Sequence, residues 1–501
     1  MLENLALGAA AIVTPFGLFI TFASVTVGIF LGAIPGLSVT MVMALFMPIS
    51  FTLQPLEGIS LLVGLYIGGM AGGLISAILI NIPGTPSSVA TCFDGYPLTQ
   101  KGQAMKALGF GVVCSFLGAL LSIIVMILVA PNLAVVAVRF GPFEYFSITI
   151  FTLTLIASLA GDSMIKGLMA GLFGMLCATI GMAPIDAVPR FTFGSTQLMA
   201  NLNILTVLIG MFALAEILVN SETSRTEDKL AAVHIDTKSI RGFGFSWAEF
   251  KGQIVNILRS AGIGIGVGVL PGIGGATINL MAYSVAKNQS KYPEKFGTGV
   301  VDGVVATETS NSASIGGAMV PLLTLGIPGD MATAILLGGF MIHGLSPGPL
   351  LFTDHPSLVY GIFVSMIIAN FFMLLVEFPG LRLFVKVLQI PKYILMPIIF
   401  TLCVVGAFGL NNRIFDTFVV IFFGIIGYLF LQLKLPVAPF IMGFILGPMT
   451  ETFFRRALML SRGDFTPFVT RPISGTFLII TAIYLTFIIV RYIKKRPKLS
   501  A

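Results

Sequence analysis

The sequence predicts an all-α polytopic membrane protein with about 10–12 transmembrane helices arranged in two related halves. Three observations predict this fold class: an apolar composition, a succession of long apolar runs, and Pro-Gly motifs that occur twice in the same order. Of the 501 residues, 56% are hydrophobic and 10% are charged, and the mean hydropathy is +1.01. Soluble domains usually carry about 25% charged residues, so water is not the solvent for most of this chain.

The apolar runs have the dimensions of transmembrane helices. A run of roughly 18 residues or more crosses a hydrocarbon core of about 30 Å as a helix. A transmembrane β-barrel would instead alternate apolar and polar positions, whereas these runs are apolar on every side. The clearest runs are Ala11–Leu31, Ile59–Ile80, Leu108–Ala130, Phe146–Leu159, Ile204–Leu218, Val359–Val376, Phe415–Phe430 and Thr476–Val490.

The charged residues indicate how the chain is divided and oriented. A polar stretch of mixed charge, residues 220–253, is expected to be a cytoplasmic linker between a first membrane half, residues 1–219, and a second, residues 254–501. The net charge of +7 collects at helix ends and in a basic tail at residues 491–498. By the positive-inside rule this tail is cytoplasmic. Glu3 replaces the basic start of a signal peptide, so the first run is expected to remain as a helix.

Two Pro-Gly motifs occur in each half. GAIPGL around Pro35 matches GVLPGI around Pro271, a separation of 236 residues. NIPGTPSS around Pro83 matches GIPGDMAT around Pro328, a separation of 245 residues. Their order and similar spacing indicate an internal repeat, and transporter precedent favours an inverted relation between the halves.

Each motif is expected to break a membrane helix, because proline removes a backbone donor and glycine tolerates positive φ. The freed backbone groups cannot face lipid, so they must be buried in protein or line a watery cavity. The result would be broken or re-entrant helices. The predicted breaks lie at Pro35, Gly36, Pro83, Pro271, Gly272 and Pro328.

The residues after the second break of each half predict an anion-binding site. The segment after Gly84 offers hydroxyl donors, a proline suited to a first helical turn and the free amides of a helix start. An ordinary surface loop before a capped helix is the alternative, but duplication of the break favours a functional site. The predicted substrate-binding residues are Asn81, Gly84, Thr85, Pro86, Ser87, Ser88, Gly329 and Asp330.

A polar cluster at Thr307–Ser314 (TETSNSAS) predicts a cation site. Its neutral oxygens suit a sodium ion, which like other hard cations prefers carbonyl, hydroxyl and carboxylate ligands. The alternative is a solvated helix end, and Asn279 and Asn311 can equally serve as interhelical hydrogen-bond residues. The predicted sodium ligands are Ser310, Asn311, Ser312, Pro328 and Gly329.

No residue pattern indicates a transition metal, another cofactor, a nucleic-acid partner or catalysis. The three histidines share no metal spacing, and neither HExxH nor a paired Asp-rich motif occurs. The cysteines have no CxxC pair and no nearby histidine, so we interpret them as small packing residues. They are Cys92, Cys114, Cys177 and Cys403.

With these motifs in view, the sequence resembles the large membrane subunit of the tripartite tricarboxylate transporters, the TctA family. The most specific motifs are Ile82–Ser88, Asp94–Gly102 (DGYPLTQKG), Leu270–Ala276 (LPGIGGA) and Gly326–Thr333. The resemblance covers essentially the whole chain.

The resemblance implies the permease subunit of a secondary transporter in a bacterial inner membrane. Its expected partners are a small four-helix membrane subunit and a periplasmic solute-binding protein that delivers a citrate-like di- or tricarboxylate. The family implies coupling to sodium, with protons as the alternative, and an elevator-type mechanism. A channel-type carboxylate permease and a membrane-embedded enzyme are the competing hypotheses. We expect the chain not to be an enzyme.

Overall fold

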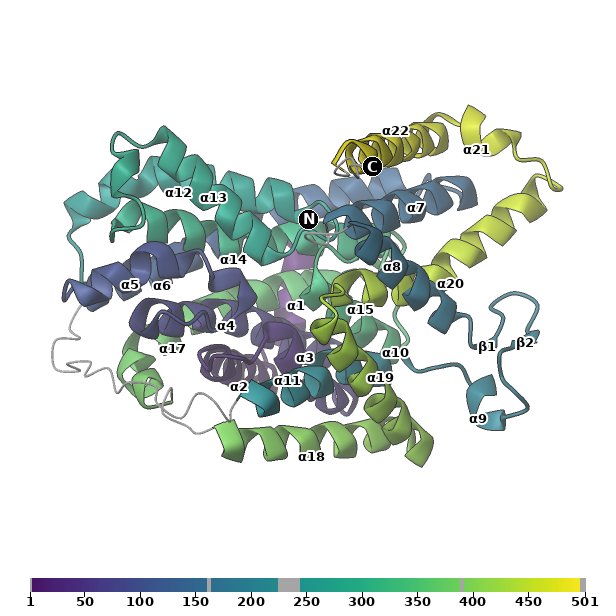
Figure 1. The fold of residues 1–501 in the computed structure, drawn as a ribbon, viewed down its shortest axis with the longest axis horizontal. Coiled ribbons are helices and arrows are strands. Elements are labelled where there is room, and N and C mark those ends of the chain that lie inside the picture. The colour runs from purple at the N-terminus through teal and green to yellow at the C-terminus, as the bar shows by residue number, and fades with distance from the viewer. Residues whose placement is uncertain (1, 160–163, 224–243, 388–391, 496–501) are drawn as a thin grey trace, which may run out of the picture. The chain divides into compact units, whose positions relative to one another are not determined.

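A computed structural model of the protein describes residues 2–159, 164–223, 244–387 and 392–495. Most of these residues are helical (Figure 1). The strands described are β1 (Gly181–Met182) and β2 (Pro189–Arg190), which pair antiparallel. Seven described helices are long and apolar enough to cross a membrane, and shorter apolar helices accompany them. The predicted all-α polytopic fold is confirmed.

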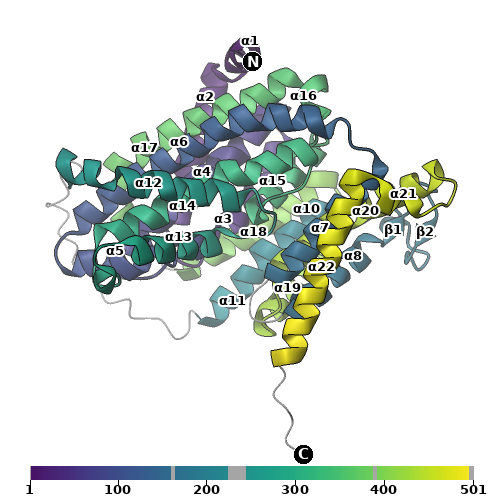
Figure 2. The same ribbon diagram turned by 90° about the horizontal axis from the view of Figure 1, so that it is seen from above.

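The chain forms two compact units, and unit 1 comprises Met1–Val135 and Leu205–Leu429. Its elements begin in the first half and continue through much of the second (Figure 2). In chain order they are α1 (Leu2–Ile12), α2 (Pro15–Gly32), α3 (Val39–Phe51), α4 (Pro55–Ile80), the 3₁₀ helix η1 (Pro86–Ser88), α5 (Thr91–Gln100), α6 (Ala104–Ala137), α10 (Ile204–Leu208), the π-helix η2 (Ile209–Leu214), α11 (Ala215–Thr223), α12 (Trp247–Gly268), α13 (Gly275–Gln289), the 3₁₀ helix η4 (Pro293–Lys295), α14 (Val301–Leu325), α15 (Met331–Ile342), α16 (Leu351–Asp354), α17 (Pro356–Val387), α18 (Lys392–Asn411) and α19 (Ile414–Gln432).

Unit 1 contains the same order of helices twice. In the first half α2 ends before Pro35, α3 follows, and α4 leads to Pro83. In the second half α12 ends before Pro271, α13 follows, and α14 leads to Pro328. The long helices have similar lengths, with 26 residues in α4 and 25 in α14. Because α2 packs on α4 as α12 packs on α14, the packing repeats as well as the order. An inverted relation between the halves stays a prediction.

Small residues allow these helix pairs to pack closely. A Cβ atom at Gly28 of α2 would lie 2.8 Å from the carbonyl oxygen of Leu65 on α4. A Cβ atom at Gly264 of α12 would lie 2.5 Å from the carbonyl oxygen of Ser310 on α14. Only glycine permits such backbone contact, which is the usual way in which membrane helices gain packing energy.

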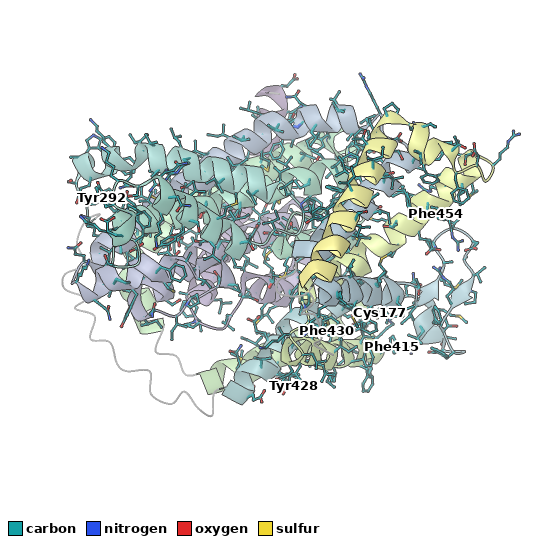
Figure 3. All side chains as sticks on the ribbon, turned by 45° about the horizontal axis from the view of Figure 1, so that its top comes forward. Cys177, Tyr292, Phe415, Tyr428, Phe430 and Phe454 are labelled. Atoms are coloured by element: carbon teal, nitrogen blue, oxygen red, sulfur yellow. The ribbon has the colours of Figure 1, made fainter. Side chains whose placement is uncertain are left out.

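Unit 2 comprises Val136–Ile204 and Phe430–Ala501. In it α20 packs on α7 and α8, and α22 packs on α7. Aromatic rings fill the contact between α7, α20 and α21, and Phe454 lies in this cluster with Phe146 and Phe468 (Figure 3). The helices are α7 (Pro142–Leu159), α8 (Met164–Ala178), α9 (Thr196–Met199), α20 (Val437–Leu460), α21 (Thr466–Thr470) and α22 (Pro472–Lys495).

Ion pairs fasten the loop around β1 and β2 to α20 within unit 2. Arg190 of β2 makes two hydrogen bonds to Glu451, at 2.9 and 3.0 Å. Arg455 donates to Asp186 at 2.9 Å, and this hydrogen bond lowers the pKa of Asp186. The bidentate contact of Arg190 with Glu451 fixes the orientation of the loop as well as its position.

Each unit draws on both predicted halves, and all four Pro-Gly breaks lie in unit 1. The linker at 220–253 is described only at its two ends, so residues 224–243 lie outside the described residues. The basic tail is described as far as residue 495, and its predicted cytoplasmic location stays a prediction. All four cysteines are buried, in agreement with their interpretation as packing residues.

A buried carboxylate joins the two halves at one end of the repeated helices. Asp94 of α5 accepts hydrogen bonds from the backbone amides of Gly297, Gly299 and Val300, at 2.8–3.0 Å. It also accepts one from the Tyr283 hydroxyl of α13 at 2.9 Å. Asp94 therefore holds the loop that opens α14, which a fully buried carboxylate can do because four donors replace its water.

We predict that Asp94→Ala lowers the free energy of unfolding in detergent by about 2–4 kcal/mol, because three amides and a hydroxyl lose a charged acceptor. Chemical denaturation of the purified chain measures the change. Asp354→Ala, at an exposed position of α16, is the matched control and is expected to change it by less than about 0.5 kcal/mol. Equal stability of both variants would show that Asp94 does not fasten α14.

Candidate functional site

The repeated motifs interrupt helices in the structure, as predicted. α4 ends at Asn81 with a left-handed φ of 57°, and α14 ends at Gly326 with a φ of 71°. Gly36 and Gly272, in the first break of each half, have φ values of 88° and 84°. These left-handed residues explain why the chain turns away from each helix axis at the motif.

Within each half, the second break packs against the region of the first. The amide of Gly272 donates to the carbonyl oxygen of Gly329 at 2.7 Å, which joins both breaks of the second half. In the first half Gly84 lies against the carbonyl oxygen of Gly32, at the end of α2. These contacts bury backbone groups at the breaks and give them hydrogen-bond partners, which lipid could not supply.

The segment after Gly84 forms a short, self-capped turn. Thr85 is the N-cap of η1, and its amide donates to the Ser88 hydroxyl at 3.3 Å. The Ser88 hydroxyl donates to the Thr85 carbonyl oxygen at 2.9 Å, and the Thr85 and Ser87 hydroxyls lie 3.0 Å apart. The structure places a three-residue 3₁₀ helix at Pro86–Ser88, where the sequence predicts a helix start. The hydroxyls first serve the turn itself, so an anion would meet a preformed turn and not free side chains.

Ser87 is the point at which this turn meets the second half. Asn279 of α13 donates its side-chain amide to the Ser87 carbonyl oxygen. A Cβ atom at Gly275, the first residue of α13, would lie 2.9 Å from the Ser87 Cβ and 3.3 Å from the Asn311 Oδ1 atom. η1, α13 and the middle of α14 therefore converge, and Asn279 is confirmed as an interhelical hydrogen-bond residue.

The polar cluster of α14 includes side chains without hydrogen-bond partners. Asn311 is fully buried, yet neither atom of its amide group has a partner among the described residues. The Ser312 hydroxyl and the Asn279 Oδ1 atom are also buried and unpartnered in the part of the chain that the structure describes. Buried polar atoms of this kind cost about 1–3 kcal/mol each. Because Asn311 lies against Gly275, which also meets Ser87, this region is the candidate ligand site.

The structure brings some predicted ligands together and separates others. Ser310 donates its hydroxyl to the Thr307 carbonyl oxygen at 3.0 Å. A Cβ at Gly329 would lie 2.6 Å from the Ala318 Cα, and Ala318 is seven residues, or about 10 Å, beyond Asn311 along α14. The structure thus places Asn311 beside Ser87 and places Pro328–Gly329 farther along α14.

Asp330, predicted to bind substrate, is a helix cap in the structure. It accepts from the Thr333 amide at 2.8 Å as the N-cap of α15. The Tyr66 hydroxyl of α4 donates to its other carboxylate oxygen at 2.5 Å. Tyr66 therefore forms a further link between the halves, while Asn81 is an exposed C-cap.

Sequence reasoning did not find the roles of Gly275 and Tyr66. The glycine pair after Pro271 (GIGGA) was a usable signal, because consecutive glycines at a helix start mark a close backbone approach. Nothing near Tyr66 in the sequence points to Asp330, 264 residues away.

Comparisons with known proteins agree with this architecture. The sequence profile of the Tripartite tricarboxylate transporter TctA family matches residues 18–442. An uncharacterized 52.8 kDa protein in the TAR-I ttuC′ 3′ region of Agrobacterium vitis is 36% identical over 478 residues, which cover 95% of this chain and 94% of the relative. A protein in the TAR-II ttuC′ 3′ region of the same organism is 42% identical over 212 residues, which cover 42% of this chain and 88% of that protein.

No solved structure matches the chain. Because the family profile spans most of the sequence and a relative aligns over nearly its whole length, the chain belongs to the TctA family of tripartite tricarboxylate transporters.

Proposed function

We propose that the chain is the substrate-translocating subunit of a sodium-coupled, binding-protein-dependent importer of citrate-like di- and tricarboxylates. Membership of the TctA family supports the role of a transporter component. One structural observation carries the proposal: Ser87, Gly275 and Asn311 meet where buried polar side chains have no partner among the described residues. A site built from both halves suits alternating access, in which a fixed site is exposed to each side in turn.

The anion is expected to bind at the turn around Ser87, with the Asn311 side-chain amide as a donor. Neither break motif, residues 82–88 or 327–333, contains lysine or arginine. A helix N-terminus contributes only about 0.3–2 kcal/mol toward a negative charge, which is too little for two or three carboxylates in a partly desolvated site. Bound cations are therefore required to balance the substrate.

Sodium is the proposed cation, and Asn311 and Ser312 are its proposed side-chain ligands. Both are buried, and their oxygen atoms have no hydrogen-bond donor among the described residues. Neutral amide and hydroxyl oxygens suit a hard cation. No other cofactor is proposed.

An elevator-type movement is the proposed mechanism of access. All four breaks lie in unit 1, while unit 2 is assembled separately from the later parts of both halves. This division supports a transport domain in unit 1 and a scaffold in unit 2. We propose a small four-helix membrane subunit and a periplasmic binding protein as partners, with the chain in a bacterial inner membrane and its C-terminus in the cytoplasm.

A channel-type permease and a membrane-embedded enzyme remain the alternatives to a non-enzymatic transporter. The family favours transport over catalysis. Saturable, sodium-dependent citrate uptake that requires the soluble binding protein would exclude the channel.

Substitution of Gly275 tests whether the substrate binds where Ser87, Gly275 and Asn311 meet. We predict that Gly275→Ala lowers the rate of citrate uptake by about tenfold or more, equivalent to about 1.4 kcal/mol, because the new methyl group would collide with Ser87. Uptake into proteoliposomes, normalised to inserted protein, measures the effect.

The adjacent Gly274→Ala variant is the matched control, because a Cβ atom at Gly274 meets nothing within 4 Å. It is expected to transport at the rate of the unmodified protein. Equal uptake by both variants would place the substrate away from Ser87.

The sodium ligands are tested separately. Asn311→Ala and Ser312→Ala should each raise the sodium concentration for half-maximal uptake by about tenfold, since each removes one ligand, with unchanged expression. Thr324→Ala is the control, because that buried hydroxyl on the same helix donates to the Val320 carbonyl oxygen. An unchanged sodium dependence in both test variants would remove these residues from the site.

A further inference from the structure

A second group of buried polar atoms lies outside the carboxylate site. Glu377 of α17 is fully buried, and neither oxygen of its carboxyl group has a hydrogen-bond partner among the described residues. α17 contains one of the seven apolar spans, Pro356–Leu381. An ionisable residue inside a membrane helix is costly and usually marks an ion or proton pathway.

Glu308 of α14 is the acidic residue whose charge acts on Glu377. Glu308 is also fully buried. The Thr91 hydroxyl of α5 donates to one oxygen of Glu308, and the Ser115 hydroxyl of α6 donates to the other at 3.2 Å. Glu308 can therefore hold a negative charge with two donors, whereas Glu377 has none among the described side chains.

The other titratable groups near the pair do not neutralise it. The charge of Glu308 acts on Cys92 of α5 and on Cys114 of α6, and neither thiol supplies a positive charge. On α4, which packs against α17, Tyr66 donates to Asp330 instead. Two ionised carboxylates whose charges interact in this buried setting would repel each other and lack solvation, and one proton removes both penalties.

We propose that Glu377 is a proton site that loads and releases one proton in each transport cycle, so that a proton gradient contributes to carboxylate uptake alongside sodium. A proton needs one acceptor oxygen, whereas a sodium ion needs several ligands, and the nearby hydroxyls are directed at Glu308. The inference rests on the proposed transport function.

The position of the pair explains how the proton affects the substrate site. Glu308 lies three residues before Asn311 on α14, about 4.5 Å along the helix axis. Loss of the proton from Glu377 adds a second negative charge that acts on Glu308. The added charge acts against the bound carboxylate, and release of proton and substrate on the same side follows.

Citrate uptake by the assembled transporter in proteoliposomes tests the proposal, with a fixed sodium gradient and with or without a pH gradient, acidic on the side of the binding protein. The pH gradient should raise the rate of citrate uptake by the unmodified protein several-fold. Glu377→Gln, which mimics the protonated group, should keep sodium-driven uptake and lose the acceleration, and Glu377→Asp should regain it. Glu294→Gln, at an exposed position of η4, is the matched control and should respond normally.

A pH response in Glu377→Gln equal to that of the unmodified protein would overturn the proposal. A changed sodium requirement with an unchanged pH response would assign Glu377 to sodium and overturn it as well. Infrared spectroscopy of the purified chain gives a readout without transport: the band of a buried protonated carboxyl should disappear in Glu377→Gln, and its persistence would contradict the assignment. Absence of all carboxylate uptake by the unmodified protein would instead refute the proposed function.

Discussion

The structure depends on one constraint: backbone groups freed at a Pro-Gly break cannot face lipid. Unit 1 meets this constraint by pairing the breaks with other parts of the same unit. The amide of Gly272 donates to the carbonyl oxygen of Gly329, and the Asn220 side chain donates to the carbonyl oxygen of Gly36 at 2.9 Å. Because the breaks are buried in this way, polar side chains near them lie in the interior of the helix bundle. A transporter of anions binds its substrate in such a place.

The links between the halves turn two repeated elements into one site. Asp94 holds the start of α14, Tyr66 holds the start of α15, and Asn279 holds the turn at Ser87. In each link, residues of the first half bond to residues of the second. Movement of one half alone would break these hydrogen bonds, so unit 1 is expected to move as a body, as an elevator mechanism requires.

Local chemistry explains which features the sequence could predict. Each Pro-Gly pair joins a residue that lacks a backbone donor to one that tolerates positive φ, so the breaks at Pro35, Pro83, Pro271 and Pro328 could be predicted. Thr85 is recognisable as a cap from its neighbours alone. The approach of Gly275 to Ser87 could not be predicted, because it depends on how α13 packs against η1. The same holds for the interaction between the charges of Glu377 and Glu308.

The central claim is that carboxylate and sodium bind together where the two halves meet. Cryo-electron microscopy of the full chain with citrate and sodium tests it most directly. The account predicts citrate density against the Ser87 turn, within hydrogen-bond distance of the Asn311 amide, and ion density at Ser312. Citrate density elsewhere, with the side chains of Asn279 and Asn311 still without a ligand, would contradict it.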